Sequence, residues 1–482
     1  MVMKAKKHSF LVEKIGGTSM SHFKEVLENI ILNKSLHNNY LKKTHPPLPP
    51  FPYGRSFIVS AYGGVTNMLL ENKKNNMPGV YHDFLQSKHF NKSLQKVLKK
   101  LLDINSKLRP LGLPLPEANF FIEKRIEDAT KLLEDLHRVM ASGYLLKENI
   151  MLATRELLAS LGESHSAFNS YLILTKRDIL SQFVDLSGFQ DHRPLTIEQR
   201  IDEGLSQLKL ENHIAIITGY VKGIEGIMRE FDRGYSDITF SKIAIKIKAA
   251  EALIHKEFHL SSADPKIVGE KKAIPVGNTN YDVADQLADV GMEAIHPKAS
   301  KPLEIANINL RVRNTFEPDH YGTLISRSYI GKKAKIEIIT GSDKVTLVEI
   351  HDPKMVNTPG FDAKLSQLFA LQNLSYIFKS TNANSISQVF WEKQLTPKII
   401  QKVKELYHTV TIEKVAIISV IGSNIAIPGM LSHTATVLSQ SKINVKCVSQ
   451  SLRQVNMQFI IDRKDYKKAI KNLHKELCEK KN

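Results

Sequence analysis

Two hydrophobic spacings alternate along the first two thirds of the chain. Short apolar runs at Phe10–Ile15, Arg55–Ala61 and His213–Thr218 are typical of buried strands. Apolar positions three and four apart separate them and predict helices. Further strands are expected at Leu172–Leu174 and Leu253–Ile254, and a further helix at Ile238–Ala249. This alternation predicts a mostly parallel sheet sandwiched by helices, up to about residue 335.

A long helical stretch interrupts this pattern from about residue 80 to about residue 160. Six apolar residues in it repeat at spacings of four and three: Ile122, Ile126, Ala129, Leu133, Leu136 and Met140. Such spacing places them on one face of a helix. We therefore expect a helical insertion within the α/β domain.

The last third of the chain repeats one order of elements. The first copy is expected at Val345–Ile350, Phe361–Leu371, Ser375–Phe378, Ser385–Phe390 and Lys398–Tyr407. The second is expected at Val415–Val420, Met430–Gln440, Asn444–Ser449, Met457–Ile461 and Tyr466–Leu477. Each copy reads strand, helix, strand, strand, helix over roughly 65 residues, which predicts two small ferredoxin-like modules. The predicted domains are 1–335, 341–410 and 413–482.

Composition narrows the class of protein. The 482 residues are 42% hydrophobic and 24% charged, as in globular domains. The two cysteines, Cys447 and Cys478, are too few for a disulfide scaffold, so we expect a cytoplasmic protein. The longest stretch without Asp, Glu, Lys or Arg, Val415–Ser441, contains polar residues, Pro and Gly, so we expect no membrane span.

The net charge is +18, from 67 Lys and Arg against 49 Asp and Glu. A nucleic-acid surface, a site for anionic substrates and a lysine-rich solvated surface each explain such an excess. No basic helix with interleaved aromatic residues accompanies it, and the chain has one Trp. We therefore expect no nucleic-acid partner.

Five of the 19 prolines fall within Pro46–Pro52. A stiff surface loop is the expected structure, and a docking site for a proline-binding partner is the alternative.

The first candidate motif is Lys14-Ile-Gly-Gly-Thr-Ser19, at the end of a predicted strand. Glycines let backbone amides approach phosphate oxygens, and Lys14 adds a mobile cation. Phosphate binding and a plain tight strand-to-helix connection both explain this pattern, and the pattern alone leaves the two open. The spacings of the P-loop and the dinucleotide fingerprint are absent.

Two further motifs follow predicted strands. Ser60-Ala-Tyr-Gly-Gly-Val-Thr-Asn67 would place a second glycine loop beside the first, at the sheet edge where ligands bind. In Phe231–Asp237, Arg233 is a candidate clamp for a carboxylate. The alternative is that Ser236 or Asp237 only caps the next helix.

Taken in order, these motifs resemble those of aspartokinase. The resemblance rests on Lys14–Ser19, Ser60–Asn67, Gly162-Glu163, Arg233–Asp237, Ser262-Ala-Asp-Pro265, His296-Pro297, Arg313–Phe316 and Gly322–Ile325. Glu13–Met20 and His255–Ser262 are most similar to the specialised aspartokinases associated with ectoine biosynthesis. The resemblance spans nearly the whole chain and implies an amino-acid-kinase-type α/β fold followed by two ACT regulatory modules.

The implied activity is transfer of the ATP γ-phosphoryl group to the β-carboxylate of L-aspartate, with Mg²⁺ entering through ATP. The product is 4-phospho-L-aspartate, in the first step of the aspartate-family or ectoine pathway. The resemblance implies catalytic roles for Lys14 and Asp237. It implies ATP or phosphate contacts for Lys14, Gly16, Gly17, Thr18, Ser19, Ser262 and Asp264, and substrate contacts for Ser60, Thr66, Glu163, Arg233 and Ser236. No protein-bound metal site is expected.

Several positions depart from the family pattern. Lys222 replaces a glycine, Asp232 and Tyr235 replace two more, and Glu293 replaces a lysine. His255–Ser262 replaces the usual nucleotide segment, so the adenosine contacts are left open. Lys256, Lys271 or Lys272 are candidate replacements for the missing lysine. His255 and His259 flank Glu257 at ligand spacing, but no third ligand follows, so we expect a loop there rather than zinc.

The resemblance to ACT domains implies a homodimer and an amino-acid effector site. Asn357–Phe361 would face Ser380–Ser385, with Gly360, Phe361, Ser380 and Asn384 as candidate contacts. Pro359-Gly360 is also ordinary turn chemistry. Two alternatives to an active aspartokinase stay open: a catalytically weak amino-acid sensor, and another carboxylate kinase of the same superfamily.

Overall fold

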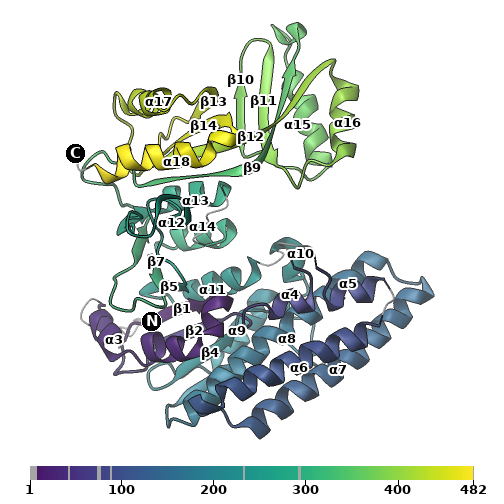
Figure 1. Ribbon diagram of the computed structural model, residues 1–482. Coiled ribbons are helices and arrows are strands. Elements are labelled where there is room, and N and C mark those ends of the chain that lie inside the picture. The colour runs from purple at the N-terminus through teal and green to yellow at the C-terminus, as the bar shows by residue number, and fades with distance from the viewer. Residues whose placement is uncertain are drawn as a thin grey trace, which may run out of the picture. The chain divides into compact units, whose positions relative to one another are not determined.

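The computed structural model of the protein describes residues 8–41, 44–72, 77–86, 89–231, 234–290 and 295–480. The chain divides into two compact units (Figure 1). Unit 1 comprises Met1–His259 and His296–Gly322, and unit 2 comprises Leu260–Ile295 and Thr323–Asn482. The predicted domain 1–335 includes parts of both units, so its boundary stays a prediction. None of the described helices combines the length and apolar character needed to cross a membrane.

Unit 1 is built on a parallel sheet of strands in the order β3-β4-β2-β1-β5-β7. The strands are β1 Leu11–Ile15, β2 Arg55–Val59, β3 Ser181–Val184, β4 Ile214–Thr218, β5 Glu251–Lys256 and β7 Leu310–Asn314. Every residue of β2, β4 and β7 is buried, so both faces of the sheet are covered. The predicted parallel α/β sheet is confirmed.

Short helices follow the strands of unit 1. They are α1 Gly17–Ser21, α2 Phe23–Glu25, the π-helix η1 Val26–Ile31, α3 Lys34–Leu41, α4 Val65–Leu69, α9 Ile197–Ser206, α10 Ile227–Phe231, α11 Tyr235–Lys246 and α14 Pro297–Ile305. Helix α11 begins directly after a loop, which places Asp237 in its first turn.

The predicted helical insertion is present in unit 1 and longer than expected. It consists of α5 Val80–Leu85, α6 Phe90–Leu108, the 3₁₀ turn η2 Arg109–Leu111, α7 Leu115–Ser142 and α8 Lys147–Thr175. Figure 1 shows α6, α7 and α8 running side by side. In the predicted seam, Ile122, Ile126, Ala129 and Leu133 are buried.

The strand predicted at Leu172–Leu174 is wrong, because these residues belong to α8. All three are buried. Three consecutive apolar residues do not distinguish a buried helix from a strand, and here the surrounding helix is buried on several sides. The nearest strand is β3, whose predominantly half-buried residues gave no clear apolar run.

The proline-rich segment Pro46–Pro52 is a loop held to its neighbours through its carbonyls. Pro47 O accepts from the Ser9 amide at 3.0 Å, and Pro49 O lies 3.0 Å from His37 Nε2. The expected loop is confirmed.

Unit 2 opens with a small layer of β6 Asn278–Asn280 and β8 Thr323–Ser326, which pair in parallel, and of α12 Pro265–Val268 and α13 Tyr281–Asp289. One hydrophobic cluster joins this layer to the C-terminal sheet. It contains Leu260, Val276, Val283, Leu287, Ile338 and Ile421. This shared core explains why residues 260–295 group with the C-terminal modules.

The C-terminal sheet of unit 2 is antiparallel, in the order β10-β11-β9-β12-β14-β13. Its strands are β9 Ile338–His351, β10 Phe378–Thr381, β11 Ser385–Trp391, β12 Thr409–Ile421, β13 Val445–Gln450 and β14 Asn456–Asp462. Its helices are α15 Phe361–Leu371, α16 Pro397–Leu406, α17 Met430–Gln440 and α18 Tyr466–His474, with η4 Pro353–Met355, η5 Arg463–Asp465 and η6 Lys475–Glu479. The predicted repeat of strand, helix, strand, strand, helix is confirmed.

The two copies of the repeat share one sheet because β9 and β12 are longer than predicted. They pair from Ile338 opposite Ile421 to His351 opposite Thr409, with a register shift between Val415 and Ile417. Gly341 lies just beyond this shift, opposite Ile418, and a Cβ atom there would stand 2.0 Å from Ile417 O. Only glycine permits this close approach of the two backbones. The strand predicted at Ser375–Phe378 was placed too early, since β10 begins at Phe378.

Candidate active site

Lys14 lies near the end of β1, and its ammonium group forms an ion pair with Asp237 Oδ1. The side chains are 13% and 16% exposed, so the pair lies at the edge of the core and is reachable. The other oxygen of Asp237 accepts from the His296 amide at 3.0 Å. Burial by itself would raise the pKa of Asp237, but Lys14, with smaller effects of Lys256 and the His296 amide, lowers it. The pair is therefore a carboxylate that holds a lysine in place.

Glu163 projects from α8 and is 2% exposed. Burial raises its pKa well above the ordinary value, and Lys14 and a backbone hydrogen bond from Tyr220 only partly offset this. Its Oε2 is buried and has no hydrogen-bond partner among the described residues. A buried carboxylate oxygen of this kind is costly unless it meets a cation or a donor.

Gly219, directly after β4, is the point where three elements converge. A Cβ atom there would lie 2.8 Å from Glu163 Oε2, 2.7 Å from Ser236 Cβ and 3.0 Å from Val59 O. The structure thus brings Glu163 and Ser236 together around a position where only glycine fits. Ser236 itself is 7% exposed at the start of α11.

The two glycine loops are neighbours, as predicted. Strands β1 and β2 pair in parallel up to Ile15 opposite Val59. A Cβ atom on Gly17 would lie 2.7 Å from Ala61 O, and the Gly63 amide donates to Ser21 Oγ at 2.7 Å. Because the two loops approach closely, the two motifs together form one polar edge of the sheet.

The residues predicted to contact phosphate differ in exposure and in the hydrogen-bond partners that they already have. Thr18 is exposed. The Gly16 amide donates to His255 O at 3.3 Å, and the buried Ser19 hydroxyl accepts from Thr315 Oγ1 at 3.0 Å. Gly16 and Ser19 are therefore engaged in holding the loop against β5 and the end of β7.

The predicted substrate contacts Ser60 and Thr66 are half-buried at the same edge. Ser60 is fixed through its backbone, since its amide donates to Ile15 O at 3.2 Å and its carbonyl accepts from Ser166 Oγ at 2.8 Å. Arg233, Asp232 and Glu293 lie outside the described residues.

The predicted ATP contacts Ser262 and Asp264 belong to unit 2. The buried Ser262 hydroxyl lies 2.8 Å from His474 Nε2 and accepts from the Ile274 amide at 3.0 Å. Asp264 caps α12 by accepting from the Lys266 amide. Both residues thus have local structural partners, and their contact with a nucleotide stays a prediction.

The predicted effector residues lie on neighbouring elements of unit 2. Gly360 caps α15 with a φ of 76°, and the Phe361 ring lies 5.5 Å from that of Tyr407. An ion pair between Asp362 and Lys379 ties the start of α15 to β10, which carries Ser380. The Asn384 carbonyl accepts from the Asp352 amide at 2.9 Å.

The positions that depart from the family pattern have their own partners. The Lys222 ammonium donates to Gly188 O at 3.2 Å and to Asp191 O at 2.7 Å, so it ties down the loop after β3. His255 bonds to Glu13 and His259 to Glu317, at 2.7 and 3.0 Å. Among the described residues, no group of three or more His, Cys, Asp or Glu is placed to hold a metal ion.

A buried cluster on the opposite face of β1 was not predicted from the sequence. Glu13, directly before Lys14, binds Arg55 Nε at 2.5 Å and His255 Nε2 at 2.7 Å, and all three are at most 1% exposed. Arg55 also donates to Ile30 O and Ile31 O. The sequence signal for this cluster is a charged residue within each of two apolar strands, Glu13 in β1 and Arg55 in β2.

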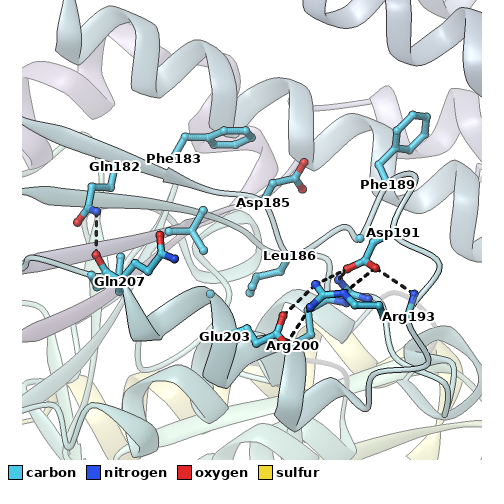
Figure 2. A pocket seen from close by; sticks show the side chains of 14 residues that line it. Gln182, Phe183, Asp185, Leu186, Phe189, Asp191, Arg193, Arg200, Glu203 and Gln207 are labelled. Carbon is cyan, nitrogen blue, oxygen red and sulfur yellow. Dashed lines mark hydrogen bonds and ion pairs between the residues drawn. The ribbon is translucent and has the colours of Figure 1, made fainter.

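Figure 2 shows a pocket of about 470 Å³ between β3, α9 and the loop after β3. Four of its charged residues bind one another, because Asp191 accepts from both Arg193 and Arg200, and Glu203 accepts from Arg193. None of the predicted site residues lines this pocket, so it is separate from the Lys14 site.

Two protein-family models match parts of the chain. The amino acid kinase family matches residues 9–314, and the ACT domain family matches residues 418–477. The chain is 42% identical over 477 residues to Aspartate kinase Ask_Ect of Stutzerimonas stutzeri, covering 98% of each protein. It is 26% identical to Aspartokinase 2, chloroplastic, of Arabidopsis thaliana, over 80% of this chain and 78% of that one.

Solved structures show the same fold at lower identity. The structure of E. coli aspartokinase III in complex with aspartate and ADP has a TM-score of 0.71 at 20% identity, over 97% of this chain and 99% of that one. The structure of Clostridium acetobutylicum aspartate kinase has a TM-score of 0.70 at 20% identity, over 97% and 100%. The predicted fold and the predicted aspartokinase resemblance, including its ectoine-associated branch, are confirmed, and the two alternative functions are not favoured. The chain belongs to the amino acid kinase family and, within it, to the aspartate kinases.

Proposed function

We propose that the site around Lys14 transfers the γ-phosphoryl group of ATP to the β-carboxylate of L-aspartate and yields 4-phospho-L-aspartate. The observation that carries this proposal is the buried Glu163 oxygen without a described partner, close to the Lys14–Asp237 pair. An amino acid with a second carboxylate supplies an ammonium group for Glu163 and an acceptor oxygen for the chemistry.

The residues divide the work by charge. Lys14 neutralises the negative charge that develops on the transferring phosphoryl group. Asp237 orients the Lys14 side chain through their ion pair. Glu163 receives the substrate ammonium, while Ser60, Thr66 and Ser236 supply hydroxyl groups at the rim. Arg233 is proposed for the α-carboxylate on the resemblance alone.

Mg²⁺ is proposed to arrive with ATP. Carboxylate oxygens such as those of Asp237 are suitable ligands for Mg²⁺. Both oxygens of Asp237 already have protein partners. Held by the nucleotide phosphates, the ion would neutralise phosphate charge. The predicted contacts of Ser262 and Asp264 belong to the same proposal.

The proposed setting follows the sequence predictions. The reaction would open the aspartate-family or ectoine pathway in the cytoplasm. A homodimer formed through the ACT modules, with an amino-acid effector near Gly360, Phe361, Ser380 and Asn384, is proposed from the resemblance.

The experiment is an assay of ATP consumption that depends on L-aspartate, with the acyl phosphate trapped as its hydroxamate. We expect turnover with L-aspartate and Mg²⁺, and at most weak turnover with L-glutamate as the matched acceptor. The absence of L-aspartate-dependent turnover at every effector concentration would disprove the proposed function.

A further inference from the structure

Helix α8 carries a second glutamate, the half-buried Glu156, on the same side as Glu163. Glu156 precedes Glu163 by seven residues, which is two turns, so the two project from one face of the helix. Glu156 Oε2 accepts from the Tyr220 hydroxyl, and Glu156 Oε1 accepts from the Met228 amide at 2.7 Å. One carboxylate therefore holds both ends of the loop between β4 and α10.

A pocket borders this loop on the side of the helical insertion. It has a volume of about 540 Å³ and is lined by Tyr220 and Gly223 of the loop and by Leu132, Leu136 and Leu157 of the helical insertion. Close packing is what normally restrains a buried backbone. Beside the pocket, directional hydrogen bonds supply restraint, and those of Glu156 act on the Tyr220 side chain and on the Met228 amide.

Tyr220 connects this loop to the candidate active site in two ways. It directly follows Gly219, where a Cβ atom would lie 2.8 Å from Glu163 Oε2, and its backbone interaction with Glu163 opposes the effect of burial on the pKa of that carboxyl group. Its ring packs edge-on against the ring of Tyr235, with centroids 5.7 Å apart, and Tyr235 directly precedes Ser236. A shift of Tyr220 would therefore move groups around both Glu163 and Ser236.

We propose that Glu156 is a positioning residue for aspartate binding, which acts by holding Tyr220 and Met228 so that the Tyr220 backbone stays against Glu163. It touches no reacting group. The inference rests on the proposed function, in which Glu163 binds the substrate ammonium.

The test separates the binding of the two substrates. In Glu156→Ala, the KM for L-aspartate should rise about tenfold or more, since the Tyr220 hydroxyl and the Met228 amide lose their acceptor and Tyr220 is no longer held in place beside Glu163. The KM for ATP should stay within about twofold, because neither Tyr220 nor Met228 is a predicted ATP contact. Tyr220→Phe keeps the ring and removes one hydrogen bond, so its KM for L-aspartate should rise less, by about threefold.

Two more variants complete the design. Glu156→Gln keeps one acceptor oxygen and should fall between the wild-type protein and Glu156→Ala. Glu148→Ala removes an exposed glutamate from the same helix and should change neither KM.

The inference is overturned if Glu156→Ala and Tyr220→Phe both leave the KM for L-aspartate unchanged, or if the KM for ATP rises equally. Should Glu156→Ala fail to fold, Tyr220→Phe decides alone. Wild-type protein without aspartate-dependent turnover would overturn the proposed function and this inference together, whereas wild-type turnover with unmoved variants overturns the inference only.

Discussion

Glu13 and Glu163 are both buried glutamates near Lys14, and their surroundings move their pKa values in opposite directions. Burial would raise the pKa of each. At Glu13 the charges and hydrogen bonds of Arg55 and His255 outweigh burial and lower the pKa to about 2. At Glu163 burial prevails and the pKa rises well above 4.5.

The difference lies in the partners, because both side chains are equally removed from water. Each oxygen of Glu13 has a protein donor, so its charge is satisfied within the fold. Glu163 has an oxygen without a partner among the described residues. Glu13 therefore suits a structural role and Glu163 suits ligand binding, and the following predictions test this contrast.

The largest effect is expected at Lys14, which follows Glu13 in β1 and partly offsets the effect of burial on the pKa of Glu163. Lys14→Ala should lower turnover by about a thousandfold or more, since the transferring group loses its preorganised cation. The fold should remain, because Asp237 keeps the His296 amide. Turnover and the thermal midpoint are measured together, with the exposed Lys24→Ala as the matched control. Retained activity in Lys14→Ala would remove Lys14 from its role.

Glu13→Ala should mainly affect stability. It leaves Arg55 as an unpaired buried charge, so the free energy of unfolding should fall by about 3–5 kcal/mol. Urea unfolding measures this, and the protein that remains folded should keep its KM for L-aspartate. An unchanged stability would contradict the structural role of Glu13.

Glu163→Gln should show the reverse pattern. Its KM for L-aspartate should rise about a hundredfold, because a neutral amide replaces the charge that meets the ammonium group. The free energy of unfolding should not fall, since an uncompensated buried carboxylate is removed. If Glu163→Gln loses as much stability as Glu13→Ala, the contrast between the two glutamates is wrong.

The two glutamates should also give opposite dependences of stability on pH. Glu13 has a folded pKa of about 2 against 4.5 unfolded, so its contribution is present above pH 4.5 and is lost as pH falls toward 2. Glu163 has a raised folded pKa, so its contribution is present below pH 4.5 and is lost as pH rises through the folded value.

Urea unfolding of wild-type protein, Glu13→Gln and Glu163→Gln between about pH 3 and pH 8 measures these slopes. The penalty of Glu13→Gln should shrink toward acid pH. The advantage of Glu163→Gln should grow toward neutral pH. Parallel curves for all three proteins would contradict both assignments.

The smallest effect is expected in unit 2, where Ser262 is a buried polar residue with full local partners. Ser262→Ala should lower the free energy of unfolding by about 1–2 kcal/mol, because the His474 ring and the Ile274 amide lose a partner. The KM for ATP is measured in parallel. A rise in that KM with unchanged stability would instead favour the predicted nucleotide contact.

Local pattern was sufficient for much of the fold. Helices α15 and α17 begin and end where the apolar spacing predicts, since a glycine precedes each one and an apolar face runs its length. The same reasoning failed at Leu172–Leu174, where burial on several sides removed the polar face that identifies a helix. The full length of β9 was missed because its first residues are stabilised by pairing with β12.

For the candidate site, the sequence indicated residue types and left their partners open. Lys14 and Asp237 were named from motifs 223 positions apart, and the fold joins them in an ion pair. Glu13 and Arg55 looked like ordinary strand residues, and the contribution of Glu156 and Tyr220 had no motif. Their roles depend on contacts between strands and helices that are distant in the chain.

The alternation of strands and helices, the C-terminal repeat and the family could all be derived from the sequence, because they rest on local spacing and ordered motifs. Which buried charge has partners and which does not became clear from the three-dimensional contacts. Burial and pairing are set by the side chains that surround a group from every direction. Neighbouring residues such as Glu13 and Lys14 therefore acquire different roles by pointing to opposite faces of one strand.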